Sequence, residues 1–264
     1  MKLVILTSNG LRHKYVVSKL VENFHVQLII SEKKSVAIED TTKLNLADAT
    51  LVREHFDKRS KSEMKYFGDY NEFSSEICHL NIPHKEINNE FVFDCINSIN
   101  PDLIILFGTS IIKGRLLKKY QRKIINLHLG LSPYYKGSAT NLFPFYYKQI
   151  ECIGATIHIA TEKVDAGDII HQYRPKIDLN DDIHDIGNKV ILKSGIEFPK
   201  AINSFLAKKN KPVKQIAIEG ILCKVQDVTP DLLRVIYSNI QTGVVEEFLN
   251  NEKSLINDKP IIKI

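Results

Sequence analysis

Short runs of aliphatic residues recur along the first two thirds of the chain, separated by polar or amphipathic stretches. Two such runs, residues 2–8 and 26–31, flank a stretch whose apolar positions repeat at helical spacing, among them Val16, Val17 and Leu20. Strand, helix and strand in this order predict a parallel sheet. Because the runs are apolar throughout rather than alternating, we expect helices to cover both faces of that sheet.

The same pattern continues downstream and then changes. It predicts strands over residues 80–83, 101–108, 123–128, 154–160 and 167–178, and helices over residues 53–67, 91–99 and 182–206. A basic, polar stretch with one proline follows at residues 207–215, and we interpret it as a linker. Beyond it, residues 216–264 predict a small α+β subdomain appended to the main α/β domain of residues 1–206.

The composition is that of a soluble globular protein, with 264 residues, 44% hydrophobic and 25% charged. Lys plus Arg exceed Asp plus Glu by 36 to 31, a formal charge of +5. This modest excess favours anionic ligands such as nucleotides or folates. The basic residues are interleaved with acidic ones, so the charge does not indicate a nucleic acid as partner.

The cysteines and the first residues of the chain bear on the cellular compartment and on metal binding. Four cysteines without a C-x-x-C pair fit neither a zinc site nor a disulfide framework, and the nine histidines show no metal-ligand spacing. The first apolar run is too short for a signal peptide or a membrane span. We therefore expect a cytoplasmic protein with reduced thiols, no metal and no membrane association.

Polar side chains stand at the end of one predicted strand. Asn126 and His128 share one side of the strand over residues 123–128, and Leu127 faces the other side. Ligands of open parallel sheets collect beyond the carboxyl ends of the strands. An amide donor and an imidazole there could stabilise an oxyanion and move a proton. The alternative, an Asn that turns the chain and a His satisfied by the backbone, is equally compatible with this stretch alone.

A carboxylate follows the next predicted strand. Asp165 is followed closely by Gly167, which indicates a tight loop that presents the acid. Taken alone, this pattern is equally that of an ordinary Asx-turn.

The motifs together carry a family resemblance. They are Asn126-Leu127-His128, Pro133-Tyr134-Tyr135-Lys136-Gly137, Thr156-Ile157-His158 and Asp165-Ala166-Gly167. In this order and spacing the chain resembles the N10-formyltetrahydrofolate-dependent formyltransferases, which include glycinamide ribonucleotide, methionyl-tRNA and sugar N-formyltransferases. The resemblance spans residues 1–206 and is strongest over residues 101–172.

The resemblance implies a Rossmann-like fold and transfer of a formyl group from N10-formyltetrahydrofolate to an amine. Asn126, His128 and Asp165 occupy the family's catalytic positions, and a structural role is expected for His158. The pterin of the folate would lie against two loops, at Gly108, Thr109, Ser110, Ile111 and Ile112 and at Lys163 and Val164.

The acceptor amine is less sharply indicated. The first turn has a single glycine where the glycinamide ribonucleotide branch has a phosphate cradle, but Asn9, Arg12 and His13 could meet an anionic group. The tail is short and lacks a basic stripe, which disfavours tRNA. The loop of residues 128–137, with Tyr134 and Lys136, looks most like that of sugar-modifying members.

We therefore expect a nucleotide-linked amino sugar as acceptor, in the kind of chemistry that serves cell-surface polysaccharide biosynthesis. Two alternatives remain: a formyltetrahydrofolate hydrolase, and a ligand-binding protein of the same fold without catalysis. The apolar positions of the tail, such as Leu232 and Ile236, could form a homodimer interface or an internal core.

Overall fold

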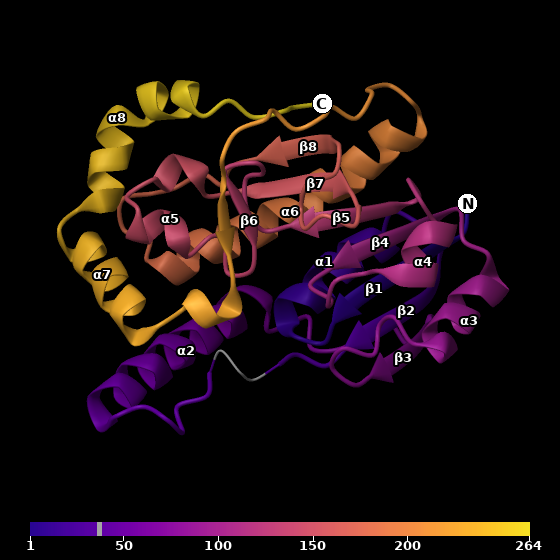
Figure 1. Ribbon diagram of the computed structural model, residues 1–264, viewed down its shortest axis with the longest axis horizontal. Helices are drawn as coiled ribbons and strands as arrows, with labels where there is room; N and C mark the ends of the chain where they lie inside the picture. The colour runs from indigo at the N-terminus through magenta and orange to yellow at the C-terminus, as the bar shows by residue number, and fades with distance from the viewer. Residues whose placement is uncertain (36–38) are drawn as a thin grey trace.

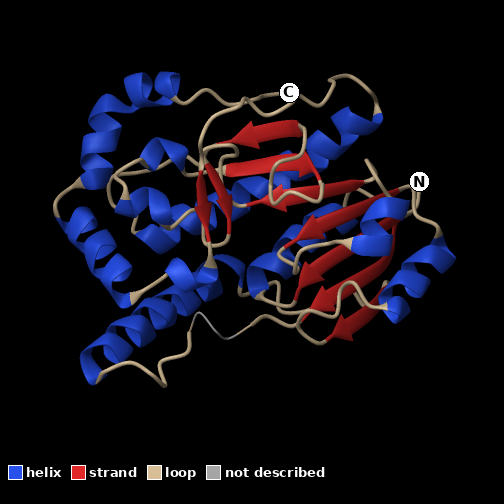
Figure 2. Ribbon diagram, in the orientation of Figure 1, coloured by secondary structure: helices blue, strands red, loops and turns tan. Residues whose placement is uncertain are grey.

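A seven-stranded sheet forms the centre of the computed structural model, which describes residues 1–35 and 39–264 (Figures 1 and 2). Its strands are β1 (Leu3–Ser8), β2 (Val26–Glu32), β3 (Cys78–Ile82), β4 (Leu103–Phe107), β5 (Ile124–His128), β7 (Ala155–Ile159) and β8 (Ile169–Tyr173). They lie in the order β3-β2-β1-β4-β5-β7-β8. The pairs from β3 to β5 are parallel, whereas the pairs β5–β7 and β7–β8 are antiparallel, so β7 alone runs against the other six strands. The predicted mostly parallel sheet is confirmed.

Helices cover both faces of this sheet. One face carries α1 (Leu11–Val21) and α6 (Ile183–Leu206), and the other carries α3 (Glu90–Ile99) and α4 (Gly114–Lys119). In β1, Ile5 shares a core cluster with Val17 of α1, whereas the next residue, Leu6, shares one with Val92 of α3. Successive residues of β1 therefore enter two different cores, which explains the continuous apolar run of residues 3–6.

A long helix, α2 (Leu46–Phe67), packs against α1, α6 and α7 outside the sheet. The sequence pattern indicated a helix only from residue 53, but the helix begins at Leu46. Its start is fixed by Asn45, whose side chain accepts a hydrogen bond from the Asp48 backbone N–H at 3.0 Å.

The remainder of the chain wraps around one end of the domain (Figure 1). It comprises β6 (Tyr135–Gly137), α5 (Phe143–Tyr146), η1 (Ile150–Cys152), β9 (Ile221–Cys223), η2 (Val225–Asp227), α7 (Pro230–Gln241) and α8 (Val244–Asp258). β9 pairs in parallel with β6, α7 contacts α5 and α2, and α8 contacts η1. The sequence pattern indicated neither β6 nor α5, because such short elements carry no periodic signal.

Two further observations concern the cysteines and the lengths of the helices. All four cysteines lie in the described part of the chain, and none is disulfide-bonded. Across residues 1–35 and 39–264, no helix combines the length and apolarity that crossing a bilayer requires.

The core position of Phe198 yields a stability prediction. Its side chain is fully buried in α6, whereas that of Ile196, two residues earlier, is 56% exposed. We expect Phe198→Ala to lower the free energy of unfolding by about 3–5 kcal/mol, because it leaves a cavity in the core. Urea denaturation followed by circular dichroism measures this change. Ile196→Ala is the matched control and should change stability by less than about 1 kcal/mol; equal losses in the two variants would contradict the assignment of this core.

Candidate active site

The pleat of β5 aims two polar side chains at one face of the sheet. Leu127 joins the core on the α1/α6 face, so Asn126 and His128 point to the opposite face. In β7, His158 lies directly across from Asn126 and shares that face. A group of polar side chains therefore forms where β5 and β7 lie beside each other.

Asp165 reaches this group from the loop that joins β7 and β8. Its backbone φ is +46°, in the left-handed region that Asp tolerates better than most residues. The Oδ1 atom lies 3.3 Å from both Asn126 Nδ2 and His158 Nε2. The Oδ2 atom lies 3.3 Å from His128 Nδ1 and accepts a 2.8 Å hydrogen bond from the Gly137 backbone N–H. The amide, imidazole and carboxylate expected to act together do converge.

Backbone groups and glycines shape the surroundings of His128. Its Nε2 lies 3.1 Å from the Tyr135 carbonyl and donates to it, which leaves Nδ1 facing Asp165. A Cβ at Gly130 would collide with the His128 ring, so the glycine two residues after the histidine makes room for it. Gly137 has φ +98° and lies too close to the Cys223 carbonyl for a side chain. The two glycines thus permit the loop to close around the imidazole.

His158 lies between the amide and the carboxylate of this group. Its Nδ1 lies 3.0 Å from the Ile159 carbonyl and donates to it. Its Nε2 lies 3.0 Å from Asn126 Nδ2 and 3.3 Å from Asp165 Oδ1. His158 therefore contacts both side chains and helps to position them.

Burial and neighbouring charges act in opposite directions on the pKa values of His128 and Asp165. Burial lowers the pKa of His128 below its ordinary value, and the negative charge of Asp165 only partly offsets this. Burial disfavours ionisation of Asp165, but His128, His158 and the Gly137 N–H together lower its pKa to about 2. Because this pKa lies below the ordinary 3.8, the ionised carboxylate stabilises the fold above about pH 4, and that contribution is lost as the pH falls towards 2.

Gln215 is a contact residue of this site that the sequence did not reveal. Its Nε2 donates to the Asp165 carbonyl at 2.7 Å and to the Gly167 carbonyl at 2.9 Å. Nearby, Val213 exchanges two 2.8 Å backbone hydrogen bonds with Ile169 of β8. Gln215 lies in the stretch with linker composition, fifty positions from Asp165, so no local pattern could have connected the two.

The loop expected to meet the pterin is held by residues at the end of β2. Glu32 accepts a 2.6 Å hydrogen bond from the Ser110 N–H, and Lys34 donates to the Gly108 carbonyl at 2.7 Å. Gly108 and Thr109 are half-buried, Ile111 is exposed and Ile112 is buried. Of the second expected loop, Lys163 and Val164 are exposed beside Asp165.

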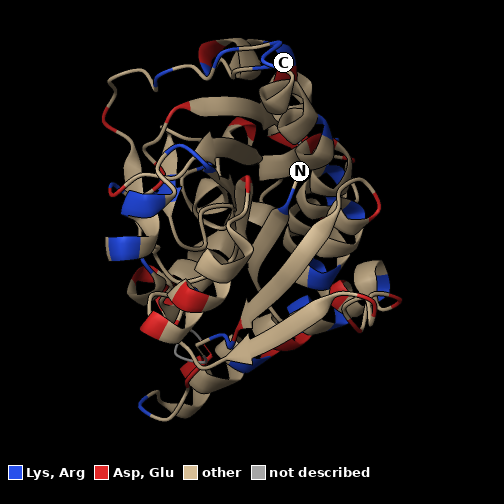
Figure 3. Ribbon diagram, turned by 90° about the vertical axis from the view of Figure 1, so that its right-hand side faces the viewer, with Lys and Arg blue, Asp and Glu red and all other residues tan. Residues whose placement is uncertain are grey.

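A cluster of positive charges lies between the first turn of α1 and α2. Glu63 Oε1 lies 2.9 Å from Arg59 Nε and 3.6 Å from an Arg12 nitrogen. Burial and then the charge of Arg59 lower the pKa of Arg12 to about 10. Burial and the charges of both arginines lower the pKa of Lys34 to about 8. We call Arg12, Lys34 and Arg59 the basic cluster. Elsewhere, over the side seen in Figure 3, basic and acidic segments are interspersed.

The other residues expected to contact substrate range from exposed to buried. Asn9 is exposed and Lys136 is half-buried in β6. His13 is 2% exposed, with its ring 4.7 Å from that of Phe107. Tyr134 is buried, and its hydroxyl donates to the Pro260 carbonyl at 3.0 Å. In the described part of the chain, no three His, Cys, Asp or Glu side chains are grouped as metal ligands would be.

The pair of His128 and Asp165 can be tested by titration. We expect long-range ¹H–¹⁵N NMR to give His128 a pKa below its ordinary value, and Asp165→Asn to lower that pKa further, because the variant lacks the charge that favours the imidazolium. Asp57→Asn, at an exposed position paired with Lys61, is the control and should leave the His128 titration unchanged. A rise of the His128 pKa in Asp165→Asn would show that the pair is not arranged as described.

Curated relatives match parts of the chain. A methionyl-tRNA formyltransferase of Finegoldia magna is 32% identical over 90 residues, which cover 34% of this chain and 29% of that protein. A formyltetrahydrofolate deformylase of Haemophilus influenzae is 22% identical over 163 residues, which cover 58% of each chain. The matched regions thus span less than two thirds of either relative.

Solved structures and a family description match more of the chain. A phosphoribosylglycinamide formyltransferase from Anaplasma phagocytophilum has a TM-score of 0.57 at 17% identity, covering 85% of this chain and 98% of that one. The formyltransferase PseJ from Anoxybacillus kamchatkensis, solved with UDP-4,6-dideoxy-4-formamido-L-AltNAc and tetrahydrofolate, has a TM-score of 0.52 at 16% identity, covering 88% and 97%. At these identities the likeness shows the Rossmann-like fold. The family described as formyl transferase matches residues 1–202, and the chain therefore belongs to that family.

Proposed function

We propose that this protein transfers the formyl group of N10-formyltetrahydrofolate to the free amine of an amino sugar. The observation that carries the proposal is the convergence of Asn126, His128 and Asp165 at the end of β5. The carbon of the formyl group on the folate is the electrophile. The formyl oxygen needs hydrogen-bond donors, and the amide of Asn126 and the imidazole of His128, both on β5, can supply them.

Two of these residues stabilise the developing negative charge. When the amine attacks, a nitrogen–carbon bond forms and the carbonyl electron pair moves to oxygen. Asn126 Nδ2 and an N–H of His128 then donate to that oxygen. Both residues are engaged within the protein, Asn126 with His158 and His128 with Tyr135. Each must therefore exchange one of these hydrogen bonds for one to the substrate.

The third residue handles the proton. The attacking amine carries a proton that must leave before the intermediate collapses, and the departing folate nitrogen must gain one. Asp165 remains ionised at neutral pH because its pKa is about 2. It therefore holds the proton only briefly, on its way to the folate nitrogen, and it favours the positive charge that develops on His128.

A nucleotide-linked acceptor is supported by the basic cluster. Arg12 follows directly after the turn at the end of β1, and Arg59 approaches it from α2. Glu63 and Glu32 offset two of the three positive charges of the cluster, so one is left for an anion. The PseJ structure contains a UDP-linked formamido sugar, which is the kind of product that this proposal predicts.

A second candidate, hydrolysis of the folate, rests on a specific similarity. The Haemophilus relative is a formyltetrahydrofolate deformylase. Asn126, His128 and Asp165, which we call the trio, would serve that reaction with water in place of the amine. The two activities differ in one observable, because only the transferase needs an amine for turnover.

The proposal predicts the outcome of an acceptor screen. Purified protein is incubated with formyl-folate and a set of nucleotide-linked amino sugars, and products are read by the mass gain of one formyl group. We expect one acceptor to be formylated, and Asn126→Ala to slow that reaction by about a hundredfold or more, because an oxyanion donor is lost. Folate turnover without any amine would favour the hydrolase. Binding of folate without turnover under any condition would favour a non-catalytic protein.

The contacts of Gln215 predict a positioning role. We expect Gln215→Ala to lower kcat by roughly tenfold with little change in the KM for folate, because the loop loses two hydrogen bonds that fix Asp165. The NMR titration of His128 should shift in parallel. Asn210→Ala is the control, because Asn210 lies on the exposed stretch just before Gln215. Gln172 is buried and is therefore unsuitable as a control position. Unchanged kcat in Gln215→Ala would remove this residue from the site.

A further inference from the structure

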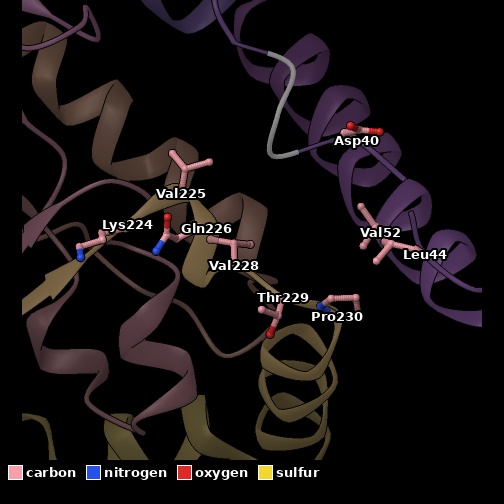
Figure 4. A pocket seen from close by; sticks show the side chains of 9 residues that line it. All are labelled: Asp40, Leu44, Val52, Lys224, Val225, Gln226, Val228, Thr229 and Pro230. Atoms are coloured by element: carbon pink, nitrogen blue, oxygen red, sulfur yellow. The ribbon is translucent and has the colours of Figure 1, made fainter. Parts of the chain in front are cut away.

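We propose that a pocket between α2 and the start of α7 binds the nucleoside end of the acceptor. This inference rests on the proposed function, because it assigns one part of the proposed acceptor to one part of the surface. The pocket, which we call the α2–α7 pocket, has a volume of about 470 Å³, within the range of small-molecule sites. Figure 4 shows its two sides, with Asp40, Leu44 and Val52 facing the segment that runs from Lys224 to Pro230.

The lining of the α2–α7 pocket suits a flat base with a polar edge. Leu44, Val52, Val228 and Pro230 supply apolar surface, and Gln226 offers an amide that can both donate and accept. Val52 is 6% exposed and belongs to a small core cluster, so the apolar floor is held firmly in place. Asp40, Lys224 and Thr229 add a carboxylate, an ammonium group and a hydroxyl to the lining. Apolar surface combined with a small number of polar groups is the usual composition of a ligand pocket.

The α2–α7 pocket begins close to the trio. Lys224, on its lining, directly follows Cys223, which pairs with Gly137 across β9 and β6. The N–H of Gly137 donates to the Asp165 carboxylate at 2.8 Å. One strand spacing and one residue therefore separate the carboxylate from Lys224, so its backbone lies within roughly 12 Å of the reacting centre.

The basic cluster lies on the same helix as the pocket floor. Arg59 follows Val52 by seven residues on α2, which is about 10 Å along the helix axis. In this assignment the sugar lies at the trio, the diphosphate lies near Arg59 and Arg12, and the base lies over Val52. The positive charge of the cluster complements the diphosphate, and the apolar floor complements the base.

Direct binding of nucleoside diphosphates tests this assignment. Isothermal titration calorimetry with UDP, dTDP, GDP and ADP, without folate, should find one that binds the wild-type protein. Val225→Trp places a large side chain in the pocket and should weaken that binding by at least about tenfold. Val235→Trp is the matched control, because Val235 is also 40% exposed but lies on α7 away from the pocket lining. It should bind as the wild type does, and both variants should keep the wild-type thermal unfolding temperature.

Several outcomes would overturn the inference and leave the proposed function standing. Formylation of an amino sugar by a protein that binds no nucleoside diphosphate would do so, as would equal binding by the two tryptophan variants. Conversely, nucleotide binding that is lost in Val225→Trp, without formyl transfer to any amine, would support the pocket and contradict the proposed acceptor chemistry.

Discussion

The site depends on keeping one carboxylate charged beneath the surface. The side chain of Asp165 is only 11% exposed, and burying a charge costs several kcal/mol unless hydrogen bonds and opposite charge compensate. The compensation comes from Asn126 and His128 of β5, His158 of β7 and the Gly137 N–H of β6. Elements far apart in the sequence thereby contact the same carboxylate. These contacts stabilise the charge of Asp165, and they also hold the surrounding residues in place.

The C-terminal part of the chain supports the same site. β6, which supplies the Gly137 N–H and the Tyr135 carbonyl, has three residues and cannot stand alone as a strand. β9 supplies its only strand partner among the described residues. Gln215, just before β9, binds the loop of Asp165 from the other side. Residues 213–223, which follow the region matched by the family, thus brace both loops of the site.

How much the sequence could predict depends on how far apart along the chain the interacting residues lie. Asn126 and His128 point to the same side of β5 because side chains alternate along a strand, and this can be predicted from the local sequence alone. The approach of Asp165 depends on tertiary structure, and only the family resemblance indicated it. The contacts of Gln215, and the ion pairs of Arg12 and Arg59 with the same carboxylate of Glu63, depend on how distant segments pack, which no periodicity encodes. Tyr134 illustrates the same limit, because its hydroxyl is bound by Pro260, 126 positions away.

The residues for the transfer and those proposed for acceptor choice lie on different elements. The trio lies on β5 and the β7–β8 loop. The basic cluster and the α2–α7 pocket are built from α1, α2, the segment after β9, and Lys34, Asp40 and Leu44 between β2 and α2. The trio is fixed by interlocking hydrogen bonds, so a change there disturbs several partners at once. At the pocket rim, the backbone of Lys224 is hydrogen-bonded to Asp227, but Lys224, Val225 and Gln226 are exposed residues. Substitutions at the rim can therefore alter which amine is presented without altering the groups that act on it.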